Sequence, residues 1–210
     1  MPNTNFCMLM WVVMEGLKMV VCLLNALQIQ KMQQNLLDIP PPEQFPHSHR
    51  VPPYVIVGDD VFPLGANIMK PYPSRDLSVE KTVHNYRQSR ARRVSENAFG
   101  ILSSRFQIYT KPIKASPESV NKIVKATVAL HNYLRVKRQE LPVDFVDRED
   151  TETNRVVPGR WRDYPAEGME NLNAVRQRPP RDGIACRNVF CEYFNNEGQV
   201  PWQNEMALHH

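Results

Sequence analysis

The spacing of apolar positions predicts two long helices in the middle of the chain. Residues 78–106 carry apolar side chains three or four positions apart, the period of a helix with one buried face. Residues 116–138 repeat this spacing, and Ser116 followed by Pro117 is typical of a helix start. The inner face expected for the second helix includes His131, which we interpret as a core histidine rather than a ligand or a base.

The same pattern predicts shorter elements before and between these helices. Residues 28–38 are predicted to be helical and residues 54–58 to form a strand. Residues 64–73 fit a short helix that ends before Pro71, because a proline cannot continue a helix. Residues 106–113 are predicted to form a short strand or an extended segment.

The regular spacing is lost after about Pro142, where the chain becomes charged and rich in turn residues. This composition predicts a tail that is disordered or irregular. Trp161 and Tyr164 leave two alternatives open, because the tail can wrap the preceding domain through these side chains or extend freely into solvent. The expected division of the chain is an atypical apolar segment at 1–27, a domain at 28–138 and the tail at 139–210.

The apolar stretch 6–27 has the length of a membrane span. Glu15 and Lys18 lie near its middle, where a charge in a bilayer is costly, and no basic residue precedes it as in a signal peptide. We therefore interpret it as a buried helix or a pair of strands and expect no membrane partner. A membrane span is the alternative.

Positive charge is concentrated between residues 81 and 138, although the net charge of the chain is only +4. A local basic face can bind phosphate in a chain of nearly neutral charge, and the alternative is a solvated helix face. The series comprises Lys81, Arg87, Arg90, Arg92, Arg93 and Arg105.

The four cysteines do not have the spacing of a secreted disulfide framework, which favours an intracellular protein. Cys186 and Cys191 lie close in sequence to His209 and His210, but the spacing fits a zinc site poorly. We interpret both cysteines as ordinary reduced thiols.

Two carboxylates, Asp59 and Asp60, directly follow the predicted strand 54–58. Aspartates at a strand end commonly form a turn, but the C-terminal edge of a sheet is also where α/β proteins place their ligands. Glu96 follows on the long helix, where the pattern alone favours an exposed pair with Arg92.

Gly100 lies one helical turn after Glu96. A glycine inside a helix lowers helix propensity by about 1 kcal/mol relative to alanine. Its presence indicates that another group approaches the helix closely at this point.

Four blocks of the sequence resemble, in order and spacing, the C-terminal half of the catalytic domain of Harbinger-type DDE transposases and of nucleases derived from them. The blocks are YVIVGDDVFPL, IMKPYP, NYRQSRARRVSENAFGILSSRFQIY and IVKATVALHNYLR. The resemblance covers about residues 28–138 and implies an α/β fold, a partial RNase H-like domain with a truncated sheet and flanking helices. It also implies DNA as the substrate and a divalent metal cofactor, Mg²⁺ or alternatively Mn²⁺.

The resemblance assigns roles to individual residues. Asp59 and Glu96 fall on the second and third of the family's three metal-binding catalytic acids, and Asp60 takes a supporting role in the turn. Phosphate contacts would come from Arg90, Arg92 and Arg93.

The family's first acid has no counterpart in a matching context in this sequence, so we expect a DNA endonuclease domain with weak or no activity. The alternative is a non-catalytic DNA- or protein-binding module from a domesticated transposase. We expect the nucleus as its location, with the cytoplasm as a second one, and a separate DNA-binding protein as partner. Since the sequence before about Gln28 to Lys31 departs from the family pattern, we hypothesise that this part is translated out of frame.

Overall fold

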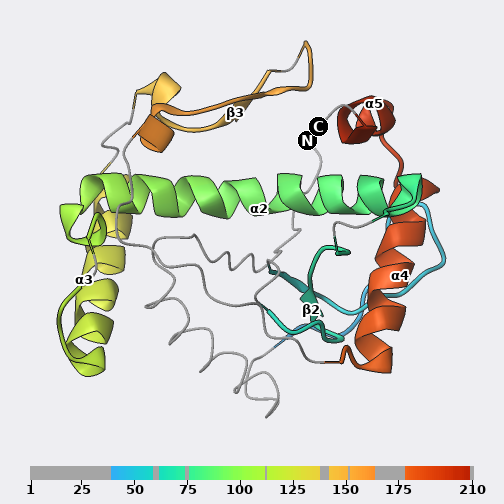
Figure 1. Ribbon diagram of the computed structural model, residues 1–210, viewed down its shortest axis with the longest axis horizontal. Helices are drawn as coiled ribbons and strands as arrows, with labels where there is room; N and C mark the ends of the chain where they lie inside the picture. Colours follow the sequence, from blue (N-terminus) through green and yellow to red (C-terminus); the bar gives the residue numbers. More distant parts are fainter. Residues whose placement is uncertain are drawn as a thin grey trace. The chain divides into compact units, whose positions relative to one another are not determined.

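The computed structural model describes residues 39–58, 62–73, 76–111, 113–137, 142–150, 152–163 and 178–208 (Figure 1). The predicted helix 28–38 and the segment 1–27 lie outside these ranges. The chain divides into two compact units, and the division falls after Arg93, within helix α2 (Val79–Arg105). In the described ranges, no helix is both long and apolar enough to cross a bilayer.

The first unit contains a parallel pair of two-residue strands, β1 (Ile56–Val57) and β2 (Ile68–Met69). Strand β1 confirms the strand predicted there, whereas β2 lies where a short helix was predicted, and that prediction is wrong. Gly65 and Ile68 exchange two backbone hydrogen bonds of 3.0 and 3.3 Å, and this tight turn aligns β2 with β1. A short helix would gain little cooperative stabilisation, so pairing with β1 prevails.

Side-chain amides of α2 hold the backbone around these strands. The Gln88 amide donates to the carbonyl oxygens of Gly58 and Met69, at 2.9 and 3.2 Å, where the two strands end. The Asn85 amide accepts from the N–H of Tyr72 at 2.8 Å and donates to its carbonyl at 2.9 Å. Both amides supply hydrogen bonds that a two-stranded sheet cannot provide for its own backbone.

The first unit also includes α4 (Arg181–Asn195) and α5 (Gln203–Leu208), which belong to the segment predicted to be a tail of low order. For residues 178–208 that prediction is wrong. Figure 1 shows α4, in orange-red, beside β2. Apolar side chains four positions apart form its inner face, a helical period that the surrounding charges obscure in the sequence. The buried core cluster comprises Phe45, Val55, Met69, Cys186 and Phe190.

His84 of α2 is fully buried in the first unit, among aromatic rings. Its ring centroid lies 5.1 Å from that of Tyr72, and the Arg187 guanidinium lies 4.0 Å from the centroid of the Tyr72 ring. Burial lowers the pKa of His84 from 6.5 to about 4 and raises the pKa of Tyr72 to about 12. Both side chains are therefore neutral near pH 7.

The second unit contains the rest of α2 and helix α3 (Pro117–Val136), and both predicted long helices are thereby confirmed. The Ser116 hydroxyl accepts from the N–H of Ser119 at 3.3 Å, which confirms the predicted cap. His131 is buried, as expected of a core histidine.

Between these helices, a 3₁₀ turn, η1 (Gln107–Tyr109), replaces the predicted strand or extended segment. Tyr109 is buried and its hydroxyl hydrogen-bonds that of Thr127 on α3. Packing of this ring against α3 fixes the turn, which the local sequence pattern does not reveal.

The second unit also contains a small hairpin with a 3₁₀ turn on either side. Strand β3 (Arg148–Glu149) pairs antiparallel with β4 (Val156–Val157), between η2 (Val143–Phe145) and η3 (Arg160–Asp163). The two turns contact each other. Of the two predicted alternatives, the described residues of 142–163 are irregular rather than disordered, and their anchoring by buried polar groups is detailed below.

Candidate functional site around Glu96

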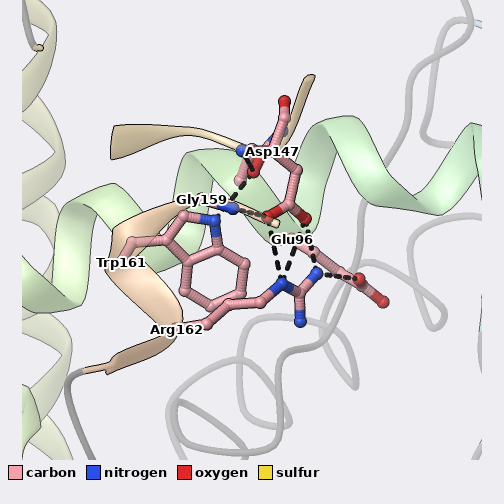
Figure 2. A network of polar contacts seen from close by, with 6 residues as sticks. Glu96, Asp147, Gly159, Trp161 and Arg162 are labelled. Atoms are coloured by element: carbon pink, nitrogen blue, oxygen red, sulfur yellow. Dashed lines mark hydrogen bonds and ion pairs between the residues drawn. The ribbon is translucent and has the colours of Figure 1, made fainter. Parts of the chain in front are cut away.

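Glu96 lies on the part of α2 that belongs to the second unit, with 24% of its side chain exposed. Its Oε2 lies 3.5 Å from Nη2 of Arg162, a residue of η3 (Figure 2). Asp59 and Asp60 lie outside the described residues, so the predicted pairing of Asp59 with Glu96 stays a prediction.

Arg162 also binds Asp147, which directly precedes β3. Its Nε lies 3.0 and 3.2 Å from the two carboxylate oxygens, and its Nη2 lies 2.5 Å from Oδ2. The Asp147 side chain is fully buried and accepts a further hydrogen bond of 2.8 Å from the N–H of Gly159. Burial alone would raise the pKa of Asp147, but the hydrogen bonds from Arg162 and Gly159 outweigh it and lower that pKa. The same pairing raises the pKa of Arg162, so both groups are ionised.

Asn97, next to Glu96, joins this network to α2. Its Oδ1 accepts from the N–H of Asp147 and from Nε1 of Trp161, both at 2.9 Å, and its Nδ2 donates to the Asp147 carbonyl at 3.0 Å. The Trp161 ring packs on Gly100, where an added Cβ would lie 2.2 Å from the ring. The prediction of a close approach at Gly100 is confirmed. Of the two alternatives left open for the tail, Trp161 supports the first, because its ring packs on the preceding helix instead of extending into solvent.

The buried Asp147 should stabilise the second unit far more than an exposed aspartate nearby. Asp147→Ala leaves the N–H of Gly159 without its acceptor and removes three contacts to Arg162, so we expect a loss of about 2 kcal/mol. Asp144→Ala is the matched control, since Asp144 pairs with Arg160 at 3.0 Å in an exposed position and should cost about 0.5 kcal/mol or less. Hydrogen exchange of residues 152–163 would measure the loss of stability in both variants. Equal losses would contradict the expectation that the buried Asp147 contributes more than the exposed Asp144.

The donor chemistry of Glu96 fits a divalent cation, because Mg²⁺ prefers carboxylate oxygens and this carboxylate is partly exposed. Asp147 does not fit, since its oxygens are buried and engaged by Arg162 and Gly159. Across the described ranges, no group of three or more histidine, cysteine or acidic side chains is placed to hold a metal ion. Glu96 therefore qualifies as one ligand, and the described residues do not complete a metal centre.

The predicted phosphate-binding arginines are half-buried on the part of α2 that belongs to the first unit. Arg90 donates to the Tyr86 hydroxyl at 3.1 Å, and its guanidinium lies 5.6 Å from the centroid of the Trp202 ring. The series does not form one solvated face, because Arg87 points inward and donates to Gln203 at 3.2 Å. Burial lowers the pKa of Arg87, which serves the packing of α5 rather than a phosphate. Side chains of Arg92 and Arg93 are half-buried too.

Both cysteines of α4, Cys186 and Cys191, are free and buried. Burial raises the pKa of the Cys186 thiol to about 11, so this thiol is protonated. His209 and His210 lie outside the described residues.

Residues 29–132 match the family model of the DDE superfamily endonucleases. Asp59 and Glu96 both lie in the matched range, and the resemblance seen in the sequence is confirmed at the level of this superfamily. The matched segment is thus similar to a DDE superfamily endonuclease, in a chain that folds into helices with small sheets. Comparison with curated proteins and with solved structures gave no significant match.

The sequence did not single out Asp147, Asn97 or Arg162 as parts of this site. All except Asn97 lie beyond the matched range, in the segment whose charge suggested disorder. The signal that could have found them is Gly100, which required a bulky partner from elsewhere in the chain.

Proposed function

We propose that this chain carries a DDE-type endonuclease domain of the Harbinger type, derived from a transposase and acting on DNA phosphodiester bonds. The observation that carries the proposal is the family match over residues 29–132, which includes Asp59 and Glu96. The RNase H-like α/β architecture belongs to the same proposal.

In this function, Asp59 and Glu96 would hold the divalent cation through carboxylate oxygens. The bound cation would supply an activated water and stabilise the leaving oxygen. The long helix α2 fixes the backbone position from which the Glu96 carboxylate extends. Arg90, Arg92 and Arg93 precede it on that helix and would attract the DNA backbone. Because only two of the three family acids have counterparts here, we propose weak hydrolysis by this chain.

A second candidate is a DNA-binding module without catalysis. It is favoured by the Arg162 guanidinium beside Glu96, a positive charge where a catalytic site would need a metal ion. This candidate requires DNA binding that falls with salt and is indifferent to metal and to Asp59→Ala.

Nicking of supercoiled plasmid with Mg²⁺ or Mn²⁺ tests the endonuclease proposal. The unmodified chain should nick slowly, and Asp59→Ala and Glu96→Gln should each reduce the rate at least about tenfold, as expected for lost metal ligands. Lys111→Ala, which changes an exposed residue after η1, is the control and should keep the rate. Metal-dependent nicking that survives both acid substitutions would reject these ligands, and metal-indifferent DNA binding without nicking would favour the second candidate.

Two further points are proposed with this function. We place the protein in the nucleus, because DNA is the proposed substrate. We also propose that a separate DNA-binding protein supplies sequence recognition.

A further inference from the structure

Several contacts hold Arg162 beside Glu96, while 41% of its side chain is exposed. Its guanidinium makes three contacts to the buried Asp147 and lies 4.3 Å from the centroid of the Trp161 ring. Trp161 is fixed in turn by its hydrogen bond to Asn97 and by the close contact with Gly100. A guanidinium with this support loses little conformational freedom when it pairs with a second carboxylate. The arrangement therefore differs from an ordinary surface ion pair.

The two carboxylates around this guanidinium are not equivalent. Asp147 is fully buried, with Arg162 at 2.5 Å, whereas Glu96 is partly exposed and lies 3.5 Å away (Figure 2). The contact between Arg162 and Glu96 can be broken with a small loss of free energy, because water can replace the guanidinium there. Asp147 cannot lose its cation without leaving a buried charge unpaired.

A divalent cation at Glu96 would meet the positive charge of Arg162 at close range. Two like charges a few ångströms apart repel each other, and a guanidinium has no lone pair with which to coordinate a metal. Arg162 therefore opposes binding of the cation for as long as its contact with Glu96 persists.

We propose that Arg162 is a positioning residue for Glu96, an internal cation that holds this carboxylate in the metal-free protein and competes with a divalent ion for it. The proposal rests on the proposed function, in which Glu96 is a metal ligand. Because Arg162 lies beyond the matched segment 29–132, the competing charge comes from outside the endonuclease-like part of the chain.

Mn²⁺ titration of the full chain, with free Mn²⁺ read by electron paramagnetic resonance, tests this without any catalysis. The double variant Asp147→Asn/Arg162→Met removes the cation together with its buried partner and leaves the local net charge unchanged. It should bind Mn²⁺ about threefold to fivefold more tightly, the factor expected for loss of a partly exposed ion pair. The matched control Asp144→Asn/Arg160→Met removes the neighbouring exposed pair and should leave the affinity unchanged.

Arg162→Lys is a second variant that keeps a cation against Asp147 and so preserves the fold. A lysine lacks the planar fork with which Arg162 spans two carboxylates, so its Mn²⁺ affinity should fall between those of the unmodified chain and the double variant. If either Arg162 variant binds Mn²⁺ no more tightly than the unmodified chain, Arg162 does not compete with the ion for Glu96.

Glu96→Gln separates this inference from the function on which it rests. If Glu96→Gln weakens Mn²⁺ binding while the Arg162 variants do not tighten it, Glu96 stands as a ligand and the role of Arg162 is rejected. If Glu96→Gln has no effect in any background, Glu96 is not a ligand and both proposals fall.

Discussion

Phe190→Ala should destabilise the first unit by about 3 to 5 kcal/mol, the cost of emptying a large aromatic site in a packed core. Phe190 is buried on α4, in edge contact with Phe45 at a centroid distance of 4.9 Å. It belongs to the same cluster as Val55, which directly precedes β1, and Met69 of β2. Hydrogen exchange across residues 39–58 and 181–195 would report the loss.

Ile184→Ala is the matched control on the same helix. Ile184 is 36% exposed, so its truncation should cost less than about 1 kcal/mol. If Phe190→Ala were no more damaging than Ile184→Ala, α4 would not be part of the core of the first unit. The expected difference also means that the matched segment 29–132 does not by itself delimit a folding unit.

Acidification should destabilise the first unit through His84. The unfolded chain binds a proton at this histidine below its ordinary pKa of 6.5, whereas the folded chain binds it only below about 4. The neutral ring therefore contributes stability that is fully present above pH 6.5 and is lost as the pH falls to about 4. The difference corresponds to about 3 kcal/mol, and urea unfolding between pH 7 and pH 4 would measure it.

His84→Phe identifies the source of this pH dependence. The substitution keeps an aromatic ring against Tyr72 and Phe194, whose centroids lie 5.1 and 5.9 Å from that of His84, but it cannot bind a proton. Stability of the variant should fall less steeply over the same range. Parallel curves for the two proteins would show that His84 does not titrate in this way.

The sequence predicted those parts of the fold that depend on local pattern. Apolar side chains recur at a helical period along α3, which also has a capping serine, and less regularly along the much longer α2, so local and tertiary preferences agree. Strand β2 and the 3₁₀ turn at Tyr109 are set by contacts with distant residues, which a short apolar run does not encode. Helix α4 was missed because arginines and prolines around it dominate the composition, while its apolar side chains recur at a helical period.

The candidate site was predictable only in part, for a similar reason. Glu96 could be singled out from the resemblance, and Gly100 from its cost in a helix. Arg162 and Asp147 could not, since their importance depends on burial and on a pairing across 15 positions in sequence. Asp59 stays a prediction, because it lies outside the described residues.

Asn85 and Asn97 occupy α2 twelve positions apart, and each holds both the N–H and the carbonyl of one loop residue. A side-chain amide can do this because its NH₂ donors and its carbonyl acceptor lie in the same plane, as the donor and acceptor of a peptide group do. Direct hydrolysis of either side-chain amide would leave an aspartate of nearly the same shape, which accepts but cannot donate. Such chemical ageing would thus leave the carbonyl of Tyr72 or Asp147 without its donor from α2, while the N–H of that residue keeps its acceptor.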